Sequence, residues 1–457
     1  MKTFLIIACL TGGQLLSAAS PSFSPLPLSK SYWKDEAFLK SFNGSYRVNA
    51  RVEPVVSTAE RGLLVSIQSL MADGKREEAL KKLTSHATAK SSAAVLFNMG
   101  NIQFELGKMK EAGESYQKAI KIHPSFLRAH RNLGFVFARS NDWKQAMPAL
   151  EEAIRLGDQH GATYGQLAYG RLNAEQYASA LQAYRLAQVT EPNSLDWKAG
   201  VAQCLQHLQR NEEALALIDE VIRARPDEVS YYLLQGSIQI SLQRGDDALA
   251  NLELVRRIGK LDAENHLLLG TLHLRSANAH LARPVILSAL AMEKKPPLQS
   301  ALNTLDFTTQ TQNWKLAQDV SAAIEKSWPE VKDRKLAAQK MRLTALIAIE
   351  SGSDPELGVS LLEKLIKQDP LDAVALVMLG KHRVSQKRSQ EAILLFEQAS
   401  RVEGSARVAH IEIAKVHVAS GDYASALKHL DAALKERESD NIRDYRNAIA
   451  NLAKAAE

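Results

Sequence analysis

Two pairs of histidines are the first residues whose spacing could support chemistry. His266 and His273 are seven positions apart, and so are His410 and His417. Seven residues of helix span about 10 Å, which is too far for two side chains to share a metal ion. Both pairs also fall at the same two positions of a repeating pattern, which favours a packing role. The sequence therefore predicts no metal site and no cofactor.

Signatures of catalysis are missing elsewhere. Gly100 and Gly107-Lys108 are too far apart for a phosphate-binding loop, and the sequence has no zinc-peptidase or nucleophile-elbow motif. Cys204 is expected inside a helix, where a buried and inert thiol is more common than a reactive one. We predict that the chain is not an enzyme.

Amide, guanidinium and aromatic side chains gather between residues 93 and 194. Such a set can hold an extended peptide, because amides bond its backbone, arginines bind its carboxylates and aromatic rings contact its side chains. Solvated polar residues on a surface without a ligand are the alternative. On an open face, Arg128 and Arg131 should be replaceable with a loss of binding and no change in melting temperature. The predicted peptide-binding residues are Asn98, Asn101, Arg128, Arg131, Asn132, Phe135, Arg139, Gln166 and Tyr169.

Positioning these residues requires successive helices that present the same side. A small residue recurs with a period near 34, and a bulky apolar residue follows it four positions later, except at Ser321. Twelve positions before the small residue, eight of the eleven copies carry Gly or Ala, which lets two helices pack closely. Turn signals such as Asn141-Asp142 separate the two helices of a copy. The recurring small residues are Ala79, Ala112, Ala146, Ala180, Ala214, Ala248, Ala282, Ala317, Gly358, Ala392 and Ala426.

Residues 161 to 194 carry the pattern most fully. They include Leu167-Ala168, Ala180, Tyr184 and Pro192. This pattern resembles the tetratricopeptide repeat, over about residues 60 to 440. The resemblance implies an all-α, right-handed α-solenoid of about eleven stacked helix pairs, whose first helices line a concave face.

The resemblance also bears on what that face binds. In tetratricopeptide domains that clamp a C-terminal carboxylate, asparagines occupy two positions that Asn101 and Asn132 match. The basic positions of that clamp are instead Phe97, Ala162 and Gln166. We therefore expect an extended peptide partner, and these departures leave open whether its carboxylate end is recognised.

The repeats fall into two blocks. Residues 59–331 hold eight units and residues 339–440 hold three, and the seven extra residues 332–338 predict a bend or loose joint. Residues 441–457 predict a capping helix. Residues 20–58 predict a proline- and serine-rich linker followed by an aromatic extension, which either caps the first unit or docks a partner.

The first nineteen residues predict a secretory signal, cleaved after Ala19. We expect a periplasmic protein without an integral membrane segment after cleavage. Cys9 leaves a lipid-anchored protein as an alternative, and an extracellular location is another. The formal charge of +6 is spread with alternating sign along the helices, so we expect no nucleic-acid partner.

The predicted function is that of an exported scaffold that binds a protein or peptide partner on its concave face. Ser31 to Asp35, Phe42 to Tyr46 and Val52-Glu53-Pro54 also resemble exported bacterial tetratricopeptide proteins associated with TonB-type energy-transduction systems. The alternative is a recruiting or regulatory subunit of a cell-envelope enzyme or of such a complex.

Overall fold

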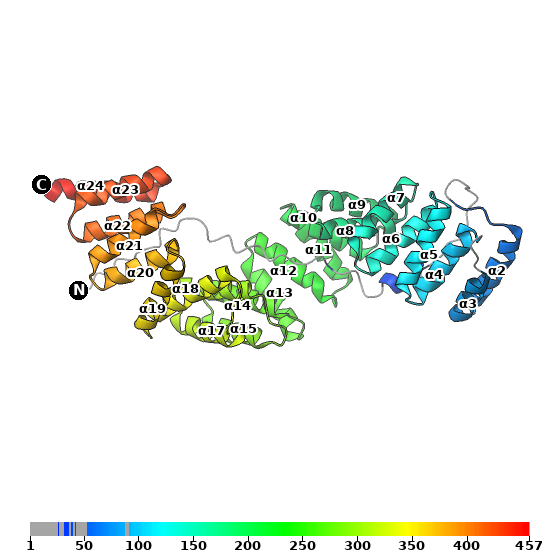
Figure 1. Ribbon diagram of the computed structural model, residues 1–457, viewed down its shortest axis with the longest axis horizontal. Helices are drawn as coiled ribbons and strands as arrows, with labels where there is room; N and C mark the ends of the chain where they lie inside the picture. The colour runs from blue at the N-terminus through cyan, green and yellow to red at the C-terminus, as the bar shows by residue number, and fades with distance from the viewer. Residues whose placement is uncertain are drawn as a thin grey trace. The chain divides into compact units, whose positions relative to one another are not determined.

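The computed structural model describes Leu26, residues 32–35, Phe38, Leu39, Phe42, residues 53–86 and residues 91–456. These residues form α-helices joined by short turns, together with one 3-10 turn, η1 (Tyr32–Lys34), and they include no strand. Most consecutive helices pack against each other within each part of the chain (Figure 1).

The chain divides into two compact units, one ending at Asn251 and the other beginning at Leu252, inside α13 (Gly245–Arg257). The first unit contains α2 (Thr58–Ala72), α3 (Arg76–His86), α4 (Ala93–Glu105), α5 (Met109–Ile122), α6 (Leu127–Arg139), α7 (Trp143–Arg155), α8 (Gly161–Asn173), α9 (Tyr177–Thr190), α10 (Leu195–His207), α11 (Asn211–Ala224) and α12 (Val229–Ser241). The second contains α14 (Ala263–Arg275), α15 (Ala279–Ala291), α16 (Leu298–Gln310), α17 (Trp314–Ser327), α18 (Arg334–Glu350), α19 (Pro355–Gln368), α20 (Ala373–Ser385), α21 (Ser389–Ser400), α22 (Ala406–Ala419), α23 (Tyr423–Glu436) and α24 (Asp440–Ala456).

In the part of the chain that the structure describes, α2 to α23 form eleven successive helix pairs, and α24 follows them. This confirms the predicted α-solenoid and its register. The small residue of the second helix is fully buried in ten copies, from Ala79 to Ala426, and Gly358 of the remaining copy is buried as well.

The glycines of the first helices are positions of close approach. A Cβ atom added at Gly100 would lie 2.7 Å from the ring of Tyr116, and one added at Gly380 would lie 2.4 Å from the ring of Phe396. Tyr116 and Phe396 are the bulky residues four positions after the small residue. The small residue of the first helix and the bulky residue of the second helix thus contact each other, as predicted.

Each turn inside a pair passes through one residue in the left-handed backbone region. Gly107 and Gly421 take this position in two pairs, but Glu175 has φ of 59° and Gln209 has φ of 61° at the same place. The next N–H then bonds back into the first helix, as Arg210 N–H does to the Leu205 carbonyl at 2.8 Å. This is the hydrogen bond of a helix end closed by a left-handed residue.

Gln209→Gly is expected to stabilise the first unit by about 0.5 to 1 kcal/mol, because glycine adopts positive φ without the clash that a Cβ atom causes. The exposed Ala216 lies within α11, so Ala216→Gly should have the opposite effect and cost about 1 kcal/mol. Urea unfolding of both variants tests this. Destabilisation of similar size in both would contradict the strain assigned to Gln209.

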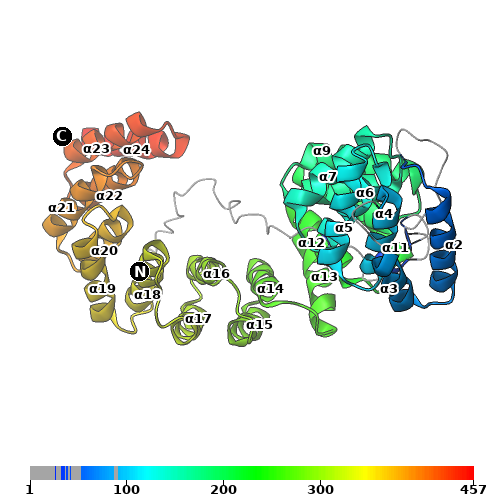
Figure 2. The same ribbon diagram turned by 45° about the vertical axis from the view of Figure 1, so that its right-hand side comes forward.

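The second unit departs from regular stacking around α16. There α14 packs on α16, and α15 packs on α17, which Figure 2 shows with these helices seen nearly end-on. Leu305 of α16 stands where most copies have Gly or Ala and is buried. The helix pair nevertheless forms, so a large residue at this position changes the packing of the pair without abolishing it.

The extra residues before α18 are mostly helical. Asp333 caps α18 by accepting the N–H groups of Lys335 and Leu336, and the helix runs for 17 residues from Arg334. Residues 334–338 of the predicted insertion therefore lengthen a repeat helix. The chain divides into its two compact units between residues 251 and 252, and the joint predicted at residues 332–338 stays a prediction.

Candidate functional site

The described residues of the N-terminal extension from Leu26 to Glu53 lie on the face of α4, α6, α8 and α10 that carries most of the predicted binding residues; we call this face the inner face. The backbone N–H of Leu26 donates to Oε1 of Gln203 on α10 at 2.9 Å. Tyr32 packs edge-on against Trp197 of the same helix, with ring centroids 5.5 Å apart. This end of the extension is therefore held by α10.

Two phenylalanines hold the other end. The Phe42 ring stacks on Phe104 of α4 at a centroid distance of 4.2 Å, and the Phe38 ring lies 5.5 Å from Phe135 of α6. Burying a phenylalanine side chain contributes about 1.5 to 3 kcal/mol, so these rings are the main apolar anchors. From Leu26 to Phe42 the extension passes from α10 to α4, opposite to the order of the helices.

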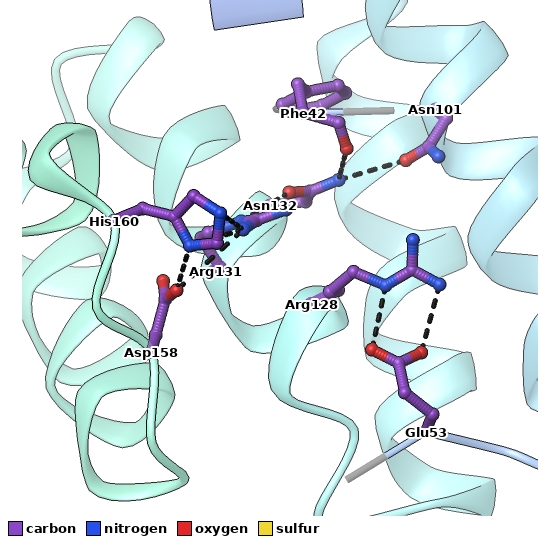
Figure 3. A network of polar contacts seen from close by, with 8 residues as sticks. All are labelled: Phe42, Glu53, Asn101, Arg128, Arg131, Asn132, Asp158 and His160. Carbon is purple, nitrogen blue, oxygen red and sulfur yellow. Dashed lines mark hydrogen bonds and ion pairs between the residues drawn. The ribbon is translucent and has the colours of Figure 1, made fainter. Parts of the chain in front are cut away.

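An ion pair fixes a later part of the extension. Nε and Nη2 of Arg128 donate to the two carboxylate oxygens of Glu53 at 2.8 and 2.9 Å (Figure 3). Both side chains are buried. A planar guanidinium that meets a carboxylate through two parallel bonds is both strong and selective in geometry.

Asn132 binds the backbone of the extension. Its Nδ2 donates to the Phe42 carbonyl at 3.2 Å and to Oδ1 of Asn101 at 3.0 Å (Figure 3). The Tyr116 hydroxyl donates to the same Asn101 oxygen at 2.7 Å, and burial raises the pKa of Tyr116. The two asparagines thus form one network that ends on a backbone carbonyl, which is the role expected for amides in peptide binding.

Arg131 is held by the loop between α7 and α8. Its Nη1 lies 3.1 Å from Nδ1 of His160 and 3.8 Å from Oδ1 of Asp158, as Figure 3 shows. Burial lowers the pKa of Arg131, and the charge of Asp158 opposes that shift. Burial would raise the pKa of Asp158, but hydrogen bonds from His160 and Thr163 and the charge of Arg131 lower it. Arg131 is therefore part of the framework of the inner face.

The remaining predicted residues lie around this centre. Gln166 is fully buried, and Tyr32 of the extension lies beside it, with a pKa that burial raises. Asn98 donates to the Ala94 carbonyl of its own helix at 2.8 Å. Arg139 lies over the Phe104 ring at 4.8 Å, and Tyr169 packs on Trp143.

The expectation of an open face is therefore wrong. Arg131 is 1% exposed, Asn132 is 0% exposed and Arg128 is 6% exposed. The positions were predicted to point toward the inner face, and Arg128, Asn132 and Phe135 do meet the extension there. What the prediction lacked was the segment that covers them.

The roles predicted for the extension also need correction. Its described residues from Leu26 to Glu53 lie against α4, α6 and α10, whereas the predicted roles were a cap on the first helix pair or a docking element for a partner. The physical reason is that Trp33, Phe38 and Phe42 find buried aromatic partners on α4 and α6. Residues 1–25, which include the predicted signal, lie outside the described residues.

Sequence reasoning missed the partners of the predicted residues. Glu53 binds Arg128 across 75 positions, and Asp158 and His160 bind Arg131 from a loop. Gln203 and Trp197 extend the inner face one helix beyond the predicted range. The one available signal was the isolated acidic residue Glu53 in an aromatic extension, opposite a surface predicted to be basic.

Comparison with known families agrees with the helix pairs. A model described as TPR repeat matches residues 100–141, and two described as tetratricopeptide repeat match residues 171–238, 345–406 and 411–456. The chain is a tetratricopeptide repeat protein. This confirms the family predicted from the repeat pattern.

Two relatives each match part of the chain. TPR repeat-containing protein YpiA of Bacillus subtilis is 26% identical over 156 residues, which cover 34% of this chain and 37% of YpiA. Hsp70-Hsp90 organizing protein 1 of Glycine max is 22% identical over 154 residues, which cover 31% of this chain and 27% of that protein. The chain thus spans only about a third of the length of these relatives.

A solved tetratricopeptide repeat protein from Parabacteroides merdae is 17% identical, with a TM-score of 0.39. The match covers 56% of this chain and all of that one.

The histidines and the cysteine noted in the sequence lie among packed side chains of the tetratricopeptide repeats. Among the described residues, no three His, Cys, Asp or Glu side chains are placed to hold a metal ion. His273 instead bonds to Glu253 at 3.0 Å. Cys204 is buried, and burial raises its thiol pKa to about 12. No described helix is both long and apolar enough to cross a bilayer.

The histidines of α22 and α23 should make the second unit sensitive to acid. Nδ1 of His410 lies 3.1 Å from Nδ1 of His429, and the His417 ring stacks on His429. Burial lowers the pKa of His410 and His429 below 6.5, and the other two histidines and Lys428 lower that of His429 further, against the opposing charge of Glu397. The charge of Glu436 likewise opposes the shift at His410.

Because the folded state binds these protons less tightly than the unfolded state, the stability present above pH 6.5 is lost as the pH falls below it. The thermal midpoint of the second unit should therefore decrease between about pH 7.5 and pH 5, and less steeply in His429→Gln. Equal slopes for parent and variant would show that this cluster does not cause the acid sensitivity.

Proposed function

We propose that this tetratricopeptide repeat protein is a scaffold, not an enzyme, and that it binds segments of partner proteins on the inner face of α4 to α10. One observation carries the proposal: this face holds a polypeptide segment through its backbone, its aromatic side chains and its carboxylate. The contacts of Asn132, Phe104 and Arg128 each use a different chemical feature of a peptide.

The type of contact favours a peptide over a small molecule. Side chains from α4, α6 and α10 contact the extension in succession, between Phe42 at one end and Leu26 at the other. A series of separate contacts along one strand of backbone is how proteins recognise extended or short helical segments. A small ligand would need its polar groups to converge on one pocket.

A variant that frees the inner face tests the proposal. Phe38→Ala combined with Phe42→Ala removes both anchor rings of the extension and leaves the repeats unchanged; we call it the released variant. We expect the full-length released variant to select segments from a displayed peptide library. Those segments should be displaced by a synthetic peptide of residues 26–56.

Circular dichroism must show that the released variant keeps its helices. If it remains helical and selects no segment that the synthetic peptide displaces, the inner face is not a binding site for partners. The segment is then a structural part of the fold.

We further propose that the protein is exported and acts in the periplasm, as part of an envelope complex. The support is the amino-terminal sequence, in which an apolar run precedes Ala18-Ala19. N-terminal sequencing of natively expressed protein should find a first residue at or near Ser20. Retention of Met1 would remove the argument for export.

A further inference from the structure

We infer that the partner segment of the inner face carries two aromatic residues four positions apart with a carboxylate C-terminal to them, runs opposite to the order of the repeats as far as its aromatic pair, and binds by displacing Leu26, Phe38, Phe42 and Glu53 from this face. This inference rests on the proposed function of the inner face. It adds the sequence features that the partner segment must have and the residues of this protein that the partner must displace.

The aromatic pair is the first requirement. Phe38 and Phe42 are both in helical conformation, and the N–H of Leu39 bonds to the Asp35 carbonyl at 2.9 Å. The two rings lie close together, with centroids 5.8 Å apart. Both rings therefore reach the wall that Phe104 and Phe135 form, and a segment with one aromatic residue would leave part of this wall uncovered.

The carboxylate is the second requirement. Glu53 and Arg128 are both buried, with side chains 9% and 8% exposed, and the guanidinium bonds both carboxylate oxygens. A buried charge that loses its partner is strongly unfavourable, whereas the bound pair tolerates burial. Arg131 already binds Asp158 and His160 of the repeats. The carboxylate of the segment is therefore bound by Arg128.

The direction of the segment follows from the order of its contacts. Leu26 bonds to Gln203 on α10, Phe38 lies against Phe135 on α6, and Phe42 lies against Phe104 on α4. Asn132 fixes the backbone by donating to the Phe42 carbonyl. Glu53, which follows Phe42 in the chain, meets Arg128 on α6, so the order of contacts is opposite to that of the helices from Leu26 to Phe42.

Displacement follows from burial. Phe42 is 0% exposed and Glu53 is 7% exposed, and the side chains that bind them are buried too. Two segments cannot fill these contacts at the same time. The extension of the protein itself is thus a competitor that any partner has to remove.

A fluorescence anisotropy experiment with full-length proteins tests the inference. The probe is a labelled synthetic peptide of residues 26–56. We expect the released variant to bind this probe at least about tenfold more tightly than the parent, because its own extension no longer competes. Probes with Glu53→Gln or Phe42→Ala should bind the released variant at least about tenfold more weakly than the unaltered probe, and a scrambled probe should not bind.

A charge exchange provides the matched control. Arg128→Glu in the released background should lose the normal probe and regain binding to a probe with Glu53→Arg. Thermal melts of each variant show whether the repeats remain folded. Restoration by the exchanged probe cannot come from a variant that has merely unfolded.

Several outcomes would overturn the inference. Equal affinity of parent and released variant would exclude displacement, and equal affinity of the unaltered probe and the probe with Glu53→Gln would exclude reading of the carboxylate. A parent protein that is dimeric in light scattering, and monomeric once released, would assign the extension on the inner face to a second copy. If library segments bind the released variant but lack this pattern, the inference fails while the proposed function stands; if no segment binds, the proposed function fails.

Discussion

Arg131→Ala is expected to destabilise the first unit by about 3 to 5 kcal/mol, the cost of removing one partner of a buried ion pair. Asp158, with a side chain only 1% exposed, would keep its carboxylate in a buried site without the guanidinium. Hydrogen bonds from His160 and Thr163 would remain and offset only part of this cost. Urea unfolding followed by circular dichroism measures the change.

Arg155→Ala is the matched control, because Arg155 pairs with Glu152 on the exposed side of α7. Exposed ion pairs are screened by solvent and contribute little to stability, so this variant should unfold almost as the parent does. Similar curves for the two arginine variants would show that Arg131 is not part of the framework. The sequence alone predicted that replacing Arg128 and Arg131 would leave the melting temperature unchanged, and their burial reverses that expectation.

Ala180→Leu is expected to destabilise the same unit by about 1 to 3 kcal/mol. Ala180 of α9 is fully buried in the core that includes Ala168 of α8, and three additional heavy atoms would force the two helices apart. Gln182→Leu, on the exposed side of α9, adds an apolar side chain without that clash. Thermal melts should separate the two variants clearly, and equal midpoints would contradict the helix register.

The helix pairs could be predicted because their contacts are local and repeated. Gly100 and Tyr116 lie one helix apart, and the same contact recurs at Gly380 and Phe396. A periodic sequence repeats the residues of such a contact many times, so the pattern can be recognised despite exceptions such as Leu305. The left-handed turn was visible only where glycine or asparagine occupies it, since Gln209 carries no signal of its conformation.

The side of the helices that forms the inner face could be predicted, but the segment that covers this face could not. The helical register indicates that Arg128 and Asn132 share one side of α6, and this is what the structure contains. The segment bound there has no periodicity, and its partners are 75 and 90 positions away, at Arg128 and Asn132. No local pattern encodes that pairing, because it depends on the complete three-dimensional surface.

The lengthened α18 illustrates a different limit. An insertion between two repeats is equally compatible with a loop and with additional helix. In the structure Asp333 caps a helix that begins at Arg334, by accepting the N–H of Lys335. The sequence pattern locates the extra residues without giving their conformation.

The distance in sequence between the extension and α10 also sets the order of events during synthesis. Leu26 and Gln203 are 177 positions apart, whereas each helix pair contacts mainly its neighbours. The extension leaves the ribosome first, and its binding surface is complete only after α10 has been made. At about 5 to 20 residues per second this takes on the order of ten seconds or more, during which Leu26 lacks its partner Gln203. Docking of the amino-terminal end of the extension on α10 is therefore a late step in the folding of the first unit.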